Sequence, residues 1–125
     1  MRLLLDTHVL LWALTDDPSL SAAARAAIVD GRNRVVVSAV SAWEITIKRS
    51  LGKLRAPADL AKEVAAHRFT PLAVSLEHAL AVGALPDLHR DPFDRLLVAQ
   101  AGVEDLTIVT RDRAIARYDV DVLGA

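Results

Sequence analysis

The chain has 125 residues, and its 15 lysines and arginines nearly balance its 16 aspartates and glutamates, which leaves a formal net charge of −1. This balance gives no overall electrostatic sign of nucleic-acid binding, so any basic surface has to be local. The absence of cysteine excludes disulfides and thiolate metal sites and is compatible with a reducing cytosol. No apolar stretch approaches the roughly 20 residues that span a bilayer, so we expect a soluble protein.

The length predicts one domain, residues 1–125, and the 53% hydrophobic content suits parallel strands covered by helices on both faces. Taken in chain order, the first half of the sequence predicts a strand over 2–5, helices over 9–14 and 22–29, a strand over 34–37, a helix ending near 50 and a helix over about 57–67. The second half predicts a strand over 72–74, a helix over 75–82, a helix starting at 91–92, a strand over 106–109, a short helix over 110–116 and a strand over 120–123. This alternation indicates an α/β fold with a parallel sheet.

Several polar residues are predicted to start or end these helices. Ser38 or Ser41 can cap the helix that ends near residue 50, and Gly52 lies just past that end. Pro57 is predicted to open the following helix, and Pro92 sits at the first position of the helix that Asp91 caps.

Four acids fall where a strand-like run gives way to a helix-like one: Asp6, Glu44, Asp94 and Asp112. In an open parallel sheet the strand-to-helix turns lie along one edge, so residues far apart in sequence converge there. Each acid also has a local explanation, because it can cap a helix, complete a Ser41-x-x-Glu44 capping box or meet the positive end of a helix dipole. Capping accepts Ser, Thr or Asn equally well, yet this chain repeatedly uses a full negative charge.

Carboxylates gathered in this way favour a cation. Two of them about 4 Å apart repel by about 4 kcal/mol at an effective dielectric constant of 20, so a cluster either holds protons or recruits a metal ion. Oxygen ligands favour Mg²⁺ or Mn²⁺ over zinc. Hydrolysis of phosphodiesters is the natural chemistry of such a site.

Four ordered segments carry a resemblance over nearly the whole chain: LLLDTHVLLWAL, VVVSAVSAWEITIKRSLGKL, LHRDPFDRLLVAQA and LTIVTRDRAIARY. In these segments the chain resembles the PIN-domain nucleases, and most closely the VapC-like toxins of bacterial toxin–antitoxin pairs. The resemblance implies a PIN-like (Rossmann-like) three-layer α/β fold around a short central parallel sheet. It also implies a cytoplasmic endoribonuclease that uses Mg²⁺ or Mn²⁺.

The resemblance extends to individual acids. It implies that Asp6, Glu44 and Asp94 are the core catalytic and metal-binding acids and that Asp112, in a Thr-Arg-Asp motif, is a fourth. Asp91 matches an additional acid, which either binds metal through water or caps its helix.

Hydroxyl and imidazole groups adjoin these acids. Thr7 follows the first acid, where the resemblance implies that a hydroxyl orients the carboxylate or a bound water, and Thr110 can do the same from the last motif. His8 and His89 flank the site in sequence, although a lone histidine is more often a packed or surface residue than a catalyst.

Basic side chains near these acids are candidate RNA contacts: Lys48, Arg49, Lys53, Arg55, Arg90 and Arg95. For Lys48 an ordinary i,i+4 pair with Glu44 is the competing explanation. Trp12 and Trp43 can stack a base, fill a groove used by a protein or pack in the core. The resemblance further implies a small antitoxin whose tail lies along an apolar groove and covers the acids, and a homodimer or toxin–antitoxin hetero-oligomer.

Other sites that gather acids on an α/β sheet fit less well. A phospho-receiver needs a late lysine, and none follows Lys62; a haloacid-dehalogenase-like phosphatase needs a second aspartate at the position of His8. Neither a G-x-G-x-x-G pattern nor a P-loop is present. A non-toxin PIN nuclease of RNA maturation or decay, and a partner-binding module with little turnover, stay open as alternatives.

Overall fold

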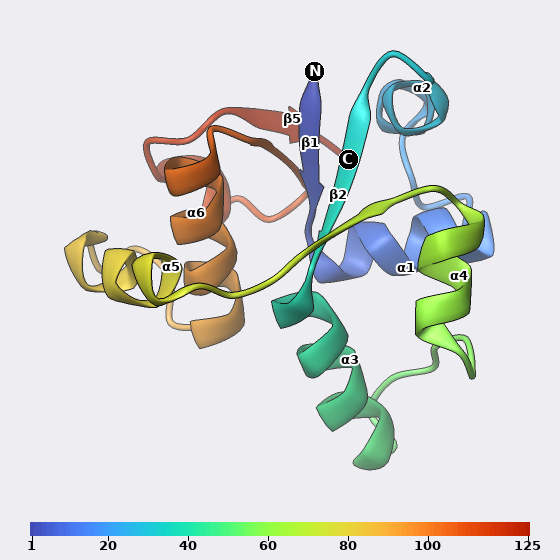
Figure 1. Ribbon diagram of the computed structural model, residues 1–125, viewed down its shortest axis with the longest axis horizontal. Helices are drawn as coiled ribbons and strands as arrows, with labels where there is room; N and C mark the ends of the chain where they lie inside the picture. The colour runs from blue at the N-terminus through green and yellow to red at the C-terminus, as the bar shows by residue number, and fades with distance from the viewer.

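The computed structural model describes residues 1–125 as five strands, six α-helices and two short 3₁₀ helices (Figure 1). In chain order these are β1 (Arg2–Leu5), α1 (Thr7–Thr15), α2 (Ala22–Val29), β2 (Arg34–Ser38), α3 (Ala39–Ser50), α4 (Leu60–Ala66), β3 (Thr70–Leu72), α5 (Leu76–Ala81), η1 (Val82–Ala84), α6 (Pro92–Glu104), β4 (Thr107–Thr110), η2 (Ile115–Arg117) and β5 (Val122–Gly124). None of the helices combines the length and the apolar run that crossing a bilayer requires.

The five strands form one parallel sheet in the order β3-β2-β1-β4-β5, which confirms the predicted α/β class. From β1 the chain adds β2 and β3 on one side and then returns to place β4 against the other side of β1. The order therefore reverses between β1 and β4. In open α/β sheets, ligands bind outside the carboxyl ends of the strands at such a reversal.

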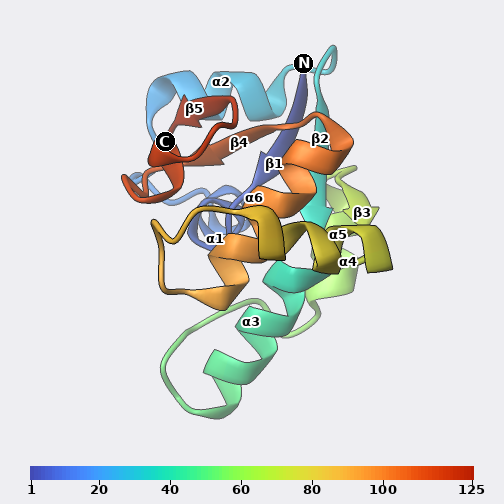
Figure 2. The ribbon, with the colours of Figure 1, turned by 90° about the vertical axis from the view of Figure 1, so that its left-hand side faces the viewer.

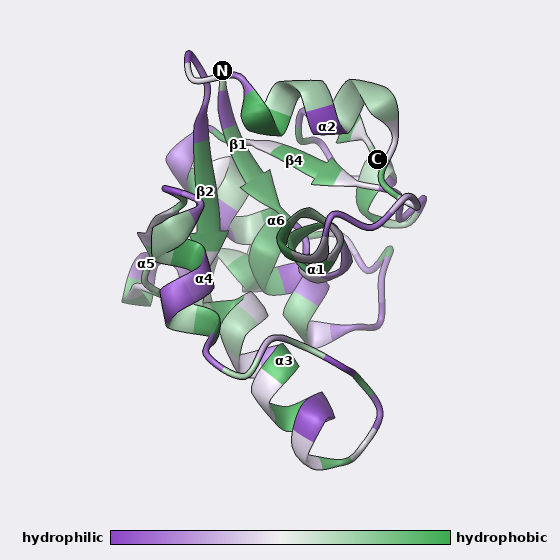
Figure 3. Ribbon diagram, turned by 90° about the vertical axis from the view of Figure 1, so that its right-hand side faces the viewer, coloured by the Kyte–Doolittle hydropathy of each residue, from purple (hydrophilic) through white to green (hydrophobic).

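Helices cover both faces of the sheet because successive side chains of a strand point to opposite sides. Leu3 and Leu5 of β1 belong to a core with α1, α2 and α4, whereas Leu4 belongs to a second core with α6. Figures 1 and 2 show α1 and α2 on one side of the strands and α5 and α6 on the other. The apolar strands lie between these layers (Figure 3).

The structure differs from the predicted elements mainly in the loops. Helix α4 begins at Leu60 rather than near residue 57, because Asp59 accepts a hydrogen bond from the Lys62 amide (3.1 Å) and so supplies the cap. Strand β3 lies two residues earlier than predicted. Of the two candidate caps, Ser38 and not Ser41 caps α3, so a Ser41–Glu44 capping box does not explain Glu44.

The predicted helix over 110–116 is also wrong. The Asp112 side chain accepts the Ala114 amide at 2.8 Å, and the resulting turn leaves only the 3₁₀ helix η2. Around it, β4 and β5 begin one and two residues later than predicted.

A buried polar network joins β2 to α6. The Ser38 hydroxyl contacts Gln100 Oε1 at 2.5 Å, and the Gln100 amide donates to the Ala73 carbonyl at 3.3 Å. Because Gln100 is fully buried, Gln100→Leu is expected to leave these partners unsatisfied and to lower the free energy of unfolding by about 1–3 kcal/mol. Urea unfolding measures the change, and Val103→Leu on the same helix serves as a control; equal stability of Gln100→Leu and the wild type would contradict the prediction.

Candidate active site

The predicted acids meet in one cavity of about 440 Å³ at the carboxyl edge of the sheet. Six of the residues predicted as catalytic, metal-binding or supporting groups line it: Asp6, Thr7, Glu44, Asp91, Asp94 and Asp112. A larger cavity, of about 770 Å³, lies elsewhere and contains none of the predicted acids. We assign the chemistry to the smaller cavity because the predicted acids, which come from distant segments, converge there.

Asp6 joins β1 to α1 at the centre of this edge. One carboxylate oxygen accepts the Val9 amide at 2.8 Å and caps α1, while the other accepts the Thr110 hydroxyl at the end of β4. Asp6 therefore both caps a helix and lies in the cluster of acids. Burial raises the pKa of the Asp6 carboxyl, and the hydrogen bonds from Thr110 and Val9 offset part of that rise.

Glu44 enters from α3. Its Oε1 accepts the Thr7 hydroxyl at 2.6 Å, and its Oε2 forms an ion pair with Lys48 one turn further along the helix. The Thr7 hydroxyl also lies 3.2 Å from the hydroxyl of Ser41. Because Ser41 faces Thr7, it belongs to the contact between α1 and α3 rather than to a helix cap.

Asp91 and Asp94 come from the start of α6, which follows a loop and not a strand. The expectation that every acid lies where a strand gives way to a helix is therefore wrong for Asp94, and also for Glu44, which lies in the second turn of α3. Helix α6 leads into the amino end of β4. Its own first turn therefore lies at the opposite edge of the sheet, where the strands end. Asp91 caps α6 by accepting the Phe93 amide at 2.8 Å.

His89 lies between two of the acids. Its Nδ1 accepts the Asp91 amide at 3.0 Å, so its Nε2 carries the proton that faces Asp112 at 2.8 Å and Asp94 at 3.1 Å. Burial alone would lower the pKa of His89, but the Asp112 hydrogen bond and the nearby carboxylates outweigh it, so that the pKa is raised. The Nε2–H group thus offsets part of the negative charge by facing both carboxylates.

The remaining negative charge changes how the acids titrate. Burial, followed by repulsion from Asp91, raises the pKa of Asp94 to about 7. Burial would raise the pKa of Asp112 as well, but hydrogen bonds from His89 and from the Ala114 amide lower it overall. Without a cation, the site therefore keeps a proton on Asp94 near neutral pH.

The donor set fits a divalent ion. One ligand atom from each of His89, Asp94 and Asp112 lies within 4.8 Å of the others, and Asp6 and Glu44 line the same cavity. Carboxylate oxygens are the ligands that Mg²⁺ and Mn²⁺ favour. An ion bound there would also displace the proton that Asp94 otherwise retains.

Among the predicted RNA-contacting residues, only Lys48 lines the cavity, and its contact with Glu44 raises its pKa. Arg49 instead donates to the Pro57 carbonyl, and Arg95 donates to the Pro86 carbonyl (3.0 Å) and to the Tyr118 hydroxyl (3.2 Å). Lys53, Arg55 and Arg90 lie outside the cavity. The cavity also contains Arg111, which the sequence analysis did not single out.

Fold and site together define a parallel α/β protein with a carboxylate-lined cavity at the reversal of its strand order. The sequence profile of the PIN domain matches residues 3–121, nearly the whole chain, so the protein belongs to the PIN-domain family. PIN domains are nucleases, which makes a hydrolase acting on nucleic acid the general class. A comparison with curated protein sequences found no match.

Solved structures share this fold. VapBC2 from Rickettsia felis, bound to a DNA fragment from its promoter, is similar with a TM-score of 0.74 and 17% identity, over 99% of this chain and 98% of that one. DNA-bound VapBC from Salmonella typhimurium has a TM-score of 0.69 and 18% identity, over 99% and 98%. FitAcB from Neisseria gonorrhoeae has a TM-score of 0.57 and 18% identity, over 97% and 96%. These likenesses support the predicted PIN-like fold and the resemblance to VapC-like proteins.

Proposed function

We propose that the protein is a Mg²⁺- or Mn²⁺-dependent endoribonuclease that hydrolyses RNA phosphodiester bonds. The observation that carries the proposal is the convergence of Asp6, Glu44, Asp94 and Asp112 on one cavity with a hard-oxygen donor set. Membership of the PIN family supplies the general activity. The choice of RNA and of these metals is the part that experiment has to test.

Each group in the cavity has a proposed role. Asp6, Glu44, Asp94 and Asp112 hold the metal, and Asp91 binds it through water while capping α6. A divalent ion bound there lowers the pKa of an attacking water and offsets charge on the leaving oxygen.

The two threonines orient these acids. Thr7 donates to Glu44 and Thr110 donates to Asp6, so each hydroxyl fixes an acid from another segment of the chain. Lys48 balances the charge of Glu44 and attracts the phosphate backbone.

The direct test is cleavage of a mixed RNA pool with the cut sites mapped. We expect cleavage with Mg²⁺ or Mn²⁺ and none in EDTA, because the acids alone repel a polyanion. Restoring Mg²⁺ after EDTA treatment should restore cleavage, which controls for loss of folded protein. Cleavage that persists in EDTA, or cleavage of DNA in preference to RNA, would overturn the proposal.

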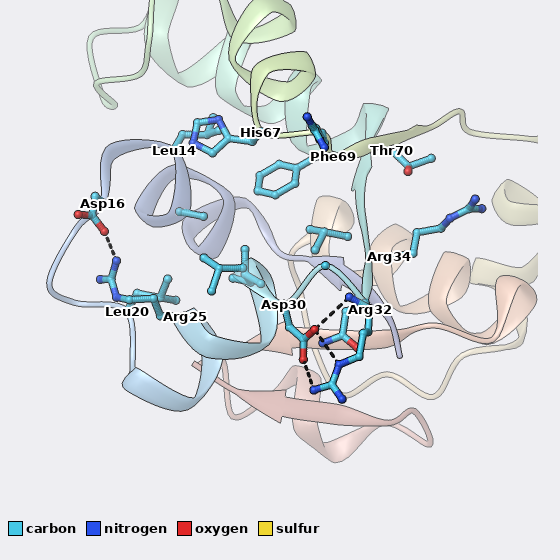
Figure 4. A pocket seen from close by; sticks show the side chains of 17 residues that line it. Leu14, Asp16, Leu20, Arg25, Asp30, Arg32, Arg34, His67, Phe69 and Thr70 are labelled. Atoms are coloured by element: carbon cyan, nitrogen blue, oxygen red, sulfur yellow. Dashed lines mark hydrogen bonds and ion pairs between the residues drawn. The ribbon is translucent and has the colours of Figure 1, made fainter.

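We further propose that the protein is the toxin of a toxin–antitoxin pair and acts in the cytoplasm, where its RNA cleavage inhibits growth or translation. The similar solved structures include VapBC assemblies, and the absence of cysteine fits a reducing compartment. A toxin of this kind needs a surface for its antitoxin. The cavity of about 770 Å³ lined by α1, α2, the start of β2 and the segment that follows α4 is our candidate (Figure 4).

This groove has an apolar floor and a basic rim. Its floor includes Leu14, Leu20, Ile28, Val35 and Phe69. Two of the rim arginines, Arg25 and Arg32, form ion pairs with aspartates (Figure 4), whereas Arg34 and Arg68 have no carboxylate partner. The groove therefore suits an amphipathic segment with acidic side chains. Ala13 and Leu14 line the groove and Trp12 lines the acidic cavity, so a segment lying along α1 reaches both.

Reversing the two free charges tests this surface. The double variant Arg34→Glu, Arg68→Glu is expected to bind the product of a small upstream open reading frame at least about tenfold more weakly, because like charges then face each other. Isothermal titration calorimetry measures the change, with Arg117→Glu outside the groove as the control. Unchanged affinity of the double variant would show that the partner binds at another surface.

The proposed homodimer has a candidate surface on the opposite layer. Leu76 and Leu80 of α5 are 75% and 70% exposed, and Val74 beside them is 41% exposed. The alternative to a toxin, a PIN nuclease of RNA maturation or decay, keeps the same active site. Absence of an upstream antitoxin gene favours that alternative.

A further inference from the structure

One wall of the acidic cavity is aromatic. His8 and Trp12 lie one turn apart on α1, and their rings stack with centroids 6.1 Å apart and planes inclined by 20°. The guanidinium carbon of Arg111 lies 4.6 Å from the centroid of the Trp12 ring. All three side chains line the cavity that contains Asp6 and Asp112. His8 and Arg111 are exposed, and Trp12 is partly exposed.

Arg111 differs from the other cations of this cavity. Lys48 is paired with Glu44, and His89 is held between Asp94 and Asp112. Arg111 donates only to backbone carbonyls, those of Ser19 and of Ala125, the latter at 2.8 Å. These two contacts fix the guanidinium beside Trp12. The wall thus combines flat rings with one guanidinium that is not paired with an Asp or Glu side chain.

We propose that His8, Trp12 and Arg111 form a subsite for one unpaired nucleotide next to the phosphate that is cut. The base stacks on the His8–Trp12 face, and Arg111 binds the phosphate of the same nucleotide. This inference rests on the proposed nuclease function, because it places the nucleotide relative to the acids. Stacking on aromatic rings combined with cationic contact to phosphate is how proteins hold single-stranded nucleic acid.

The placement follows from the sequence neighbours of the wall. His8 is two residues from Asp6, and Arg111 directly precedes Asp112, so each end of the wall adjoins an acid of the cavity. A volume of about 440 Å³ falls within the usual range of roughly 300–1,000 Å³ for small-ligand pockets. A base that is paired in a duplex cannot offer its face, so the subsite selects unpaired RNA.

Binding can be tested without cleavage. The probes are the tetranucleotides rA₄ and rU₄ and an rA₄ carrying one abasic position, with Mg²⁺ present. Asp94→Asn prevents turnover, and Trp43→Phe leaves Trp12 as the only tryptophan reporter. We expect rA₄ to quench the Trp12 fluorescence and to bind more tightly than rU₄, since a purine offers the larger stacking surface, and we expect the abasic probe to bind most weakly.

Variants separate stacking from charge. In the Asp94→Asn background, anisotropy of dye-labelled rA₄ is expected to show a Kd about 5- to 150-fold weaker for Trp12→Leu, the usual range for loss of one stacked base, with Trp12→Phe close to the parent. Arg111→Gln is expected to reduce the slope of log K against log salt by about 0.7, the value for one lost phosphate contact on a single strand. Circular dichroism and melting curves confirm that each variant is folded.

The outcomes distinguish this subsite from the proposed function. If the wild type cleaves RNA while the Trp12 and Arg111 variants bind rA₄ like the parent, the subsite is overturned and the nuclease stands. If the wild type cleaves nothing but rA₄ still quenches Trp12 and its binding depends on both residues, the subsite stands and the nuclease fails. If Trp12→Leu weakens only the complex with the antitoxin, the wall is a protein contact and the subsite is overturned.

Discussion

Replacing Asp6 or Glu44 by its amide is expected to reduce RNA cleavage at least about 100-fold, which is the upper range for loss of a group that merely supports a metal ligand. The charge is removed, while the shape and most hydrogen bonds are kept. Asparagine at position 6 can still accept the Val9 amide and cap α1, and glutamine at position 44 can still accept the Thr7 hydroxyl. Loss of activity therefore reports on charge at the metal site rather than on folding.

A mapped cleavage assay at saturating Mg²⁺ measures this effect, and Asp94→Asn should behave in the same way. Asp121→Asn, an exposed acid outside the cavity, is the matched control and should cleave like the wild type. Thermal melting verifies that each variant is folded. Full activity of folded Asp6→Asn, Glu44→Gln and Asp94→Asn proteins would refute the proposed metal site.

Metal-free Asp94→Asn protein is expected to be more stable than the wild type at pH 8, by about 1–2 kcal/mol after discounting for solvent screening, or roughly 5 °C in Tm. The pKa of Asp94 rises from the ordinary value of 3.8 to about 7 in the folded protein. Between these pH values the folded state binds the proton more tightly than the unfolded state, so stability falls as pH rises. Asparagine cannot ionise, so the variant escapes this loss.

Thermal melting in EDTA at a series of pH values measures this prediction. The difference in Tm between variant and wild type should shrink steadily from pH 8 towards pH 4, where Asp94 is protonated in most folded molecules. Adding Mg²⁺ should reverse the order at pH 8, because only the wild type gains the full stabilisation of a bound ion. A variant that is less stable than the wild type at pH 8 in EDTA would show that burial and charge repulsion do not make the ionised Asp94 destabilising.

The sequence predicts the layers of this protein well because they depend on local patterns. Apolar runs such as LLL and VVV can be satisfied only in buried parallel strands, and the serine and aspartate caps begin helices where the pattern changes. Elements without such a signal are less well predicted. The bounds of α4 depend on one side-chain contact of Asp59, and the turn after β4 depends on how Asp112 folds back on its own backbone.

The acids and several of their neighbours were found in the sequence, but the contacts that position them were not. Asp94 reaches the site because α6 runs back towards β4, which is a property of the chain path rather than of its flanking residues. His89 is positioned by a loop, and Arg111 by carbonyls from residues 19 and 125. Arg34 and Arg68 meet at one groove from separate segments. These contacts join residues that are far apart in the sequence, so no local sequence pattern predicts them.

The threonine contacts have an evolutionary consequence. Thr7 serves an acid on α3, and Thr110 serves the acid at the end of β1, so neither hydroxyl belongs to the segment whose carboxylate it steadies. A substitution at either threonine therefore affects an acid from another part of the sequence. Among relatives that retain activity, positions 7 and 110 should therefore exchange freely only between threonine and serine, and any other replacement should be inherited together with a change at the matching acid.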